Sequence, residues 1–225
     1  MRAVFVLYKM RLIYKKAEST RYLGHLDMLR TFIRGLRRAN VPVKYSKGFN
    51  PHAVLTFALP IGVGLTSDCE IVDVEVMENI NISEAINNIN SKMPPNSIQV
   101  LSGEYATGRM PIIEQAEYII DIESKSDINA GEINDALSSH EIMVEKISKK
   151  KTTQINIIDH IFSYKVLGSS KHSIKISVTI SAGSTVNIKP QLVTEALKSA
   201  VPSLDVAYCL YHRKKFIFSD TRGKQ

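Results

Sequence analysis

Alternation of hydrophobic and polar residues recurs along the first half of the chain, and this is the pattern of half-buried β-strands. The alternating or extended stretches are residues 3–16, 41–46, 53–58, 70–76 and 98–105. Hydrophobic residues recur at steps of three and four, as on one face of an α-helix, in residues 25–40 and 83–93. Ser83 is the expected N-cap of the second helix. With residues 53–58 counted as a further extended piece and not as a separate strand, the predicted order is strand, helix, strand, strand, helix, strand.

The second half repeats this order without visible sequence similarity to the first. Its predicted strands are residues 116–123, 141–146, 154–167, 172–181 and 206–218, and its predicted helices are residues 130–140 and 189–197. We expect residues 154–167 to pair with one another around Asp159 and His160, after a lysine-rich loop at residues 149–153.

This repeated order predicts an α+β fold made of two tandem ferredoxin-like halves, because strand, helix, strand, strand, helix, strand is typical of such domains. We expect the halves at residues 1–107 and 116–225, with residues 108–115 as the connector. At fold level the arrangement resembles Cas6-type RNA-processing proteins. That analogy does not by itself establish a function.

The helix predicted at residues 25–40 has an unusual distribution of charge. Its expected hydrophobic stripe consists of Leu26, Leu29, Ile33 and Leu36. The opposite face carries Arg30, Arg34, Arg37 and Arg38. Like charges four residues apart on a helix are destabilising, so local stability does not explain this row. Because guanidinium groups suit phosphate or carboxylate, we expect an anionic partner. The alternative is a solvated face balanced by acids such as Asp27.

A turn rich in polar and aromatic side chains is predicted directly after this helix. Its residues are Tyr45, Ser46, Lys47, Gly48, Phe49, Asn50, Pro51 and His52. Gly48 permits a positive φ, and Pro51 fixes its own φ and disfavours a helical conformation at Asn50. The turn carries more reactive groups than a connection requires, which favours a binding role. An ordinary structural turn remains the alternative.

Positive charge is concentrated near the start of the chain. The whole sequence of 225 residues has a formal net charge of +7. Residues 1–52 contain twelve Lys or Arg against two acids, a balance of +10, so the remaining residues carry 17 minus 20, or −3. This asymmetry favours a polyanionic partner, with nucleic acid the first candidate and an acidic protein surface the second.

The remaining composition excludes several classes of protein. Cys69 and Cys209 are the two cysteines, so no disulfide framework and no three-cysteine iron–sulfur site is expected. No P-loop, dinucleotide fingerprint, nucleophile elbow or zinc-binding cysteine pair occurs. The first residues are too short an apolar run for a signal peptide or membrane span. We expect a cytoplasmic protein that binds no cofactor and no membrane.

Residues 10–75 also carry a family resemblance. Its motifs are Gly24–Asp27, Arg30, Leu36–Ala39, Pro42–Val43, Tyr45–His52, Phe57–Pro60, Gly62–Gly64, Ser67 and Glu70. Together they resemble the radical SAM-linked protein family, also known as the DUF2344 domain. That family is encoded beside, or fused to, radical SAM proteins, often near genes for ribosomal proteins and ribonucleases. The resemblance implies a radical SAM protein as partner, and it supplies no reaction.

Three functions follow as hypotheses. The first is an RNA-binding or substrate-presenting accessory protein that works with a radical SAM enzyme in tRNA, rRNA or ribosome maturation. Its RNA-binding or anion-binding residues would be Arg21, Arg30, Arg34, Arg37, Arg38, Lys47, Phe49, Asn50 and His52. The second is a docking module for the radical SAM partner that does not contact RNA.

The third is a metal-independent ribonuclease. His25 and His52 would be its general acid and base, assisted by Tyr45, because imidazole titrates near neutral pH. A metal site is a weaker possibility, because its candidate ligands lack the local spacing of known motifs. Those candidates are His25, Asp27, His52 and Glu70.

Overall fold

The computed structural model describes residues 8–147 and 152–219. The chain divides into two compact units, Met1–Pro111 and Ile112–Gln225, at a position within the predicted connector. The strands pair in antiparallel fashion and the helices are few, so the predicted α+β class is confirmed. Residues 3–7 of the first predicted strand, and residues 149–151 of the predicted lysine-rich loop, lie outside the described residues.

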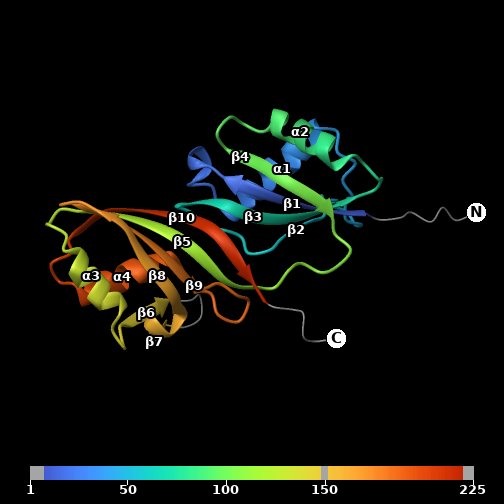
Figure 1. The fold of residues 1–225 in the computed structure, drawn as a ribbon. Helices are drawn as coiled ribbons and strands as arrows, with labels where there is room; N and C mark the ends of the chain where they lie inside the picture. Colours follow the sequence, from blue (N-terminus) through green and yellow to red (C-terminus); the bar gives the residue numbers. More distant parts are fainter. Residues whose placement is uncertain (1–7, 148–151, 220–225) are drawn as a thin grey trace, which may run out of the picture. The chain divides into compact units, whose positions relative to one another are not determined.

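The first unit has the predicted order of elements, but its second strand lies in residues 53–58 instead of residues 41–46 (Figure 1). Its elements are β1 (Tyr8–Lys16), α1 (His25–Arg38), β2 (Leu55–Phe57), β3 (Leu65–Val76), α2 (Ile82–Lys92) and β4 (Ile98–Tyr105). The strands lie in the order β4, β1, β3, β2, and each neighbouring pair is antiparallel. Both helices pack on the same face of this sheet and share one core with β1, β3 and β4.

Aromatic rings fill the centre of that core. The ring of Phe32 on α1 meets the rings of Tyr14 and Phe57 edge to face, with centroids 4.6 and 5.8 Å apart. Such pairs add about 0.5–1.5 kcal/mol beyond the area they bury. Gly35 lets α1 approach α2 closely, because a Cβ atom there would lie 2.5 Å from the methyl carbon of Met93. These contacts fix how α1 is rotated on the sheet.

The predicted hydrophobic stripe of α1 is wrong in part. The buried residues are Met28, Phe32, Gly35 and Leu36, whereas Leu26 is 63% exposed. Met28 and Phe32 bury more apolar area than Leu26 could, and Gly35 must face α2, so the helix is rotated from the predicted position. At about 100° per residue the four arginines still fall within roughly 100° of arc, opposite the buried stripe.

Two local predictions in the first unit are also corrected. Residues 41–46 do not form a regular strand, because only isolated bridges join Val43 to Val76 and Tyr45 to Ala53. Pro42 contributes to this irregularity, because it has no N–H to donate to a ladder. The N-cap of α2 is Asn81 instead of Ser83, and its side chain accepts a hydrogen bond from the backbone N–H of Glu84 at 3.1 Å.

The second unit contains one larger and one smaller sheet. Its elements are β5 (Ile113–Ser124), α3 (Ala130–Leu137), β6 (Met143–Ile147), β7 (Thr152–Asn156), β8 (Ile161–Ser169), β9 (Ser173–Ser181), α4 (Pro190–Ala200) and β10 (Val206–Phe218). The larger sheet has the antiparallel order β10, β5, β9, β8, and β6 pairs with β7 separately. Alternate residues of β5 and β9, such as Ile120 and Ile176, form the core with the helices.

The predicted pairing of residues 154–167 with themselves is wrong. β7 pairs with β6, β8 pairs with β9, and a short 3-10 turn at Ile158–His160 separates β7 from β8. The side chain of Asn156 explains this arrangement locally. Its Oδ1 accepts from the backbone N–H of Ile142 at 3.0 Å, and its Nδ2 donates to the carboxylate of Asp159 at 3.1 Å. Asn156 therefore holds the end of β7 next to the start of β6.

No helix of the described residues is long and apolar enough to cross a membrane.

Candidate functional site

The arginines of α1 form an exposed basic surface, which we call the arginine face: Arg30, Arg34, Arg37 and Arg38. Arg30 pairs with Asp27 at 3.2 Å, and both side chains are more than half exposed. Within the described ranges, no acidic side chain lies within ion-pair distance of Arg34, Arg37 or Arg38. Asp27 therefore neutralises one of the four arginine charges, that of Arg30.

The segment around the arginine face is devoid of acids. No Asp or Glu occurs between Asp27 and Asp68, whereas this stretch holds six Lys or Arg. One of the six, Lys44, pairs with Glu75 of β3 at 2.7 Å. Lys47 is exposed in the turn that follows. The arginine face thus supplies four of the six cations of this stretch of sequence, and Lys47 is a further exposed cation.

The turn at residues 45–52 is closed by hydrogen bonds at its base. The backbone N–H of Ser46 donates to the carbonyl of His52 at 2.8 Å, and the N–H of His52 donates to Ser46 Oγ at 3.1 Å. Ser46 Oγ also lies 2.9 Å from Nδ1 of the His52 ring. Below these bonds, Tyr45 bridges to Ala53. The turn is therefore closed at its base, and its tip is exposed.

The tip of this turn presents an aromatic ring to solvent. Phe49 has a relative exposure of 108%, the largest of the exposed hydrophobic residues among those described. The preceding residue, Gly48, has φ +124°, a conformation that side chains with a Cβ rarely adopt. Lys47, two residues before Phe49 in the chain, and Asn50, the residue after it, are also exposed. The turn therefore combines an exposed ring with a cation and an amide.

The two candidate catalytic histidines occupy separate environments. His25 is exposed at the first turn of α1, and its ring meets Phe57 edge to face with centroids 5.2 Å apart. His52 is held by Ser46 in the turn. Among the described residues, neither a hydrogen bond nor a ring contact joins the two histidines. Tyr45, the third candidate, is 47% exposed and lies at the base of the turn.

Arg21 differs from the other candidate anion-binding residues because it is buried. Its relative exposure is 5%, and its guanidinium pairs with Glu18 at 2.6 Å. A buried and paired guanidinium is not available to a large anion on the surface. We therefore leave Arg21 out of the candidate surface.

A buried lysine that sequence reasoning missed organises the start of α1. Lys16, with a relative exposure of 1%, donates from Nζ to the backbone carbonyls of Arg21, Leu23 and Gly62 at 3.0, 3.2 and 3.3 Å. These contacts connect the end of β1 to the entry of α1 and to the loop before β3. A further bond, from the N–H of Gly64 to the carbonyl of Arg21 at 3.0 Å, joins the same segments.

The signal for this burial was present in the alternation of β1. Lys16 has the same parity as Met10, Leu12 and Tyr14, all of which point into the core. Strict alternation therefore places Lys16 on the buried face.

The candidate metal ligands are not gathered into a site. Among the described residues, no group of three or more His, Cys, Asp or Glu side chains is arranged to hold a metal ion. Glu70 is 2% exposed and lies opposite Tyr14 in the pairing of β1 with β3, whereas His52 is exposed in the turn.

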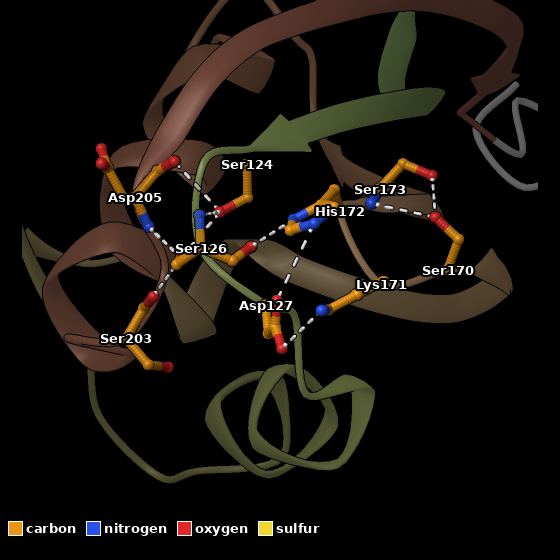
Figure 2. A network of polar contacts seen from close by, with 9 residues as sticks. All are labelled: Ser124, Ser126, Asp127, Ser170, Lys171, His172, Ser173, Ser203 and Asp205. Atoms are coloured by element: carbon orange, nitrogen blue, oxygen red, sulfur yellow. Dashed lines mark hydrogen bonds and ion pairs between the residues drawn. The ribbon is translucent and has the colours of Figure 1, made fainter.

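A polar network in the second unit contains Ser, His and Asp side chains (Figure 2). His172 Nδ1 lies 3.2 Å from the backbone carbonyl oxygen of Ser126. The histidine therefore contacts the backbone of Ser126 and not its side-chain hydroxyl group. The hydroxyl of Ser126 instead donates to the carbonyl of Ser203 and accepts from the N–H of Asp205 at 3.1 Å. Because the serine hydroxyl is not held by the histidine, this arrangement is not a nucleophile with its base. It ties the end of β5 to the loop before β10.

Two solved structures are similar to this chain at low sequence identity. A chain of a Cbf5–Nop10–Gar1 complex is 9% identical, with a TM-score of 0.43, over 80% of this chain and 42% of that chain. A chain of an H/ACA RNP bound to a substrate RNA containing 2'-deoxyuridine is 8% identical, with a TM-score of 0.47, over 89% and 46%. The chain thus spans less than half the length of these two chains. No curated protein matches it.

A family model matches most of the chain. The model is described as an uncharacterized protein conserved in bacteria, DUF2344, and it matches residues 9–190. This range contains the arginine face, the turn at residues 45–52 and most of the second unit. The chain therefore belongs to the DUF2344 family.

Proposed function

We propose that this chain is an RNA-binding or substrate-presenting accessory protein that works with a radical SAM enzyme in tRNA, rRNA or ribosome maturation. The observation that carries the RNA part is the arginine face, of which Arg34, Arg37 and Arg38 have no acidic partner within ion-pair distance in the described part of the chain. The radical SAM partner rests on the family resemblance of residues 10–75. The two thiols, Cys69 and Cys209, fit a reducing cytoplasm.

The geometry of α1 suits a nucleic-acid backbone. Arg30 and Arg38 are eight residues apart, or about 12 Å along the helix axis at 1.5 Å per residue. Several neighbouring phosphates fit along that length, and guanidinium groups can bind phosphate oxygens in bidentate fashion. Such contacts supply affinity and position without reading sequence. Sequence or shape would then be read by the turn at residues 45–52.

We further infer that each unit is a ferredoxin-like domain. The first unit has the order of elements typical of that fold. The second unit has the same order if the β6–β7 hairpin is treated as an insertion between α3 and β8. In both units the strand that comes first in the chain lies between the third and fourth strands of its sheet, with the hairpin left out of the count.

A docking role for the radical SAM partner is the second candidate, and exposed hydrophobic residues near the start of α1 favour it. Tyr22, Leu26 and Val63 are 69, 63 and 55% exposed. A Cβ atom on Gly24 would lie 3.9 Å from the side chain of Val63, so the loop before β3 lies beside the entry of α1. Tyrosine is a common anchor in protein interfaces, and neighbouring exposed apolar side chains can extend such a contact.

The RNA proposal is tested by reversing two charges on the arginine face. The double variant Arg34→Glu and Arg37→Glu lowers the formal net charge from +7 to +3, because each substitution removes two charges. We expect its affinity for total tRNA and rRNA, measured by filter binding at fixed salt, to fall at least about tenfold. The matched control is Lys125→Glu with Lys189→Glu, two exposed lysines of the second unit with the same change in charge.

The control should retain most of the wild-type affinity, because net charge alone is a weak determinant compared with local phosphate contacts. Equal losses in the two double variants would contradict a specific surface on α1. The docking candidate is tested separately, by copurifying the radical SAM protein before and after nuclease treatment. A complex that survives nuclease and is lost on Leu26→Asp favours docking.

A further inference from the structure

The turn at residues 45–52 has a feature that phosphate binding does not explain. Phe49 presents its whole ring to solvent, although an aromatic ring is stabilised by burial. A turn that needs only to connect two segments has no use for a phenylalanine at its tip. The ring is therefore best explained by an occupant that covers it.

Hydrogen bonds close the base of the turn that carries this ring before any partner binds. Ser46 contacts His52 through its backbone N–H and through its hydroxyl group, and the bridge from Tyr45 to Ala53 lies directly below. Gly48, with φ +124°, makes the bend that carries Phe49 outward. A turn whose backbone is already closed at its base loses less conformational entropy on binding than an open loop does. This is the property expected of a recognition group.

The charge around the turn decides which occupant fits best. Lys47 is the exposed charged side chain beside Phe49, and no acid occurs in the sequence from Met28 to Ser67. An apolar pocket on a protein would not require this excess of positive charge. A nucleobase satisfies both features, because its flat face stacks on the ring and its own phosphate is anionic.

On these grounds, and resting on the proposed function, we propose that the RNA bound by this protein carries an unpaired nucleotide whose base stacks on Phe49. The substrate class is RNA with a single-stranded or loop nucleotide, and a uniform duplex cannot make the contact with Phe49. In an A-form duplex the bases are stacked on one another and their faces are covered. Only a nucleotide outside the duplex can offer its face to the ring.

The test uses the full chain and three labelled RNAs of equal length: a duplex, a stem-loop and a single strand. We expect Phe49→Ala to weaken binding of the stem-loop and the single strand by about 5-fold to 150-fold, the range for loss of one stacked base. Binding of the duplex should not change. The matched control is Phe162→Ala, an exposed phenylalanine of the second unit, and it should leave all three affinities unchanged.

A spectroscopic readout reports stacking directly. The chain contains no tryptophan, so Phe49→Trp introduces a single indole at the tip of the turn. We expect this variant to bind the stem-loop as the wild type does, and its fluorescence to be quenched by the stem-loop and the single strand. The duplex should not quench it.

The outcomes separate this inference from the proposed function. If Phe49→Ala binds the stem-loop as tightly as the wild type, while Arg34→Glu with Arg37→Glu weakens binding, the stacking inference is wrong and the RNA surface stands. If the wild type binds none of the three RNAs, both are wrong. If Phe49→Ala loses only a protein partner and no RNA affinity, the ring is a protein anchor and the inference is again overturned.

Discussion

Replacing Lys16 with methionine tests how the start of α1 is positioned. Methionine keeps the length of the side chain but cannot donate a hydrogen bond. The substitution therefore removes the bonds from Nζ to the carbonyls of Arg21, Leu23 and Gly62 while leaving the volume nearly unchanged. The β1 strand and the core should remain intact, so the effect isolates the polar contacts.

The magnitude follows from two opposing contributions. Hydrogen bonds from a charged donor contribute about 1.5–3 kcal/mol each, and the bonds at 3.2 and 3.3 Å fall at the lower end of that range. The substitution also removes a cost, because the methionine variant does not have to desolvate a buried ammonium group, which costs several kcal/mol. The carbonyl of Arg21 also keeps the N–H of Gly64 as a donor. We expect a net loss of about 2–4 kcal/mol.

Urea denaturation followed by circular dichroism measures this loss, and hydrogen exchange locates it. The amide of Gly64 should exchange faster in Lys16→Met, because the loop before β3 loses its connection to Lys16. The matched control is Lys15→Met, the neighbouring residue on the opposite face of β1, which should change stability by less than about 0.5 kcal/mol. If Lys16→Met is as stable as the wild type and protects Gly64 equally, the positioning role is refuted.

Two further predictions concern the second unit. The hydroxyl of Ser177 and then the ammonium of Lys215 lower the pKa of Glu117. The stability that Glu117 contributes is therefore present above its unfolded pKa of about 4.3 and is lost as pH falls through the lower folded pKa. In Glu117→Gln the free energy of unfolding should depend less steeply on pH below about 4.3, and a pH dependence equal to that of the wild type would contradict this. Burial raises the pKa of the Cys209 thiol. In a Cys69→Ala background its alkylation rate should therefore reach half of its maximum at a pH above the pKa of about 8.5 of an ordinary thiol. A half-maximal rate at that ordinary pKa would contradict the raised pKa.

Much of the fold could be predicted from the sequence, because the long elements carry their own periodicity. The alternation in β1 and β9, and the apolar spacing of α2, depend only on which side chains must be buried. Strand pairing is harder to predict, because the alternation of a short strand such as β6 or β7 does not indicate which neighbour it pairs with. The caps were also uncertain, because Asn81 and Ser83 are both good N-cap residues.

The candidate site was predicted only in part. The arginine face was recognisable because its four members share one side of a helix whatever the exact rotation. The rotation itself was not predictable from α1 alone, because it depends on Gly35 meeting Met93 of another segment. The burial of Arg21 depends likewise on the tertiary structure, in which Lys16 of β1 and Gly64 of the loop before β3 both donate to its backbone carbonyl. The exposure of Phe49 follows from a turn whose hydrogen bonds cannot be read from residue types.

The salt dependence of RNA affinity tests the central claim most directly. For single-stranded nucleic acid, each phosphate contact contributes about −0.7 to the slope of the logarithm of the association constant plotted against the logarithm of the salt concentration. We predict that Arg34→Glu with Arg37→Glu makes this slope shallower by about 1.4, while Lys125→Glu with Lys189→Glu leaves it unchanged. A slope that is the same in the wild type and the α1 double variant would contradict the assignment of the arginine face to RNA.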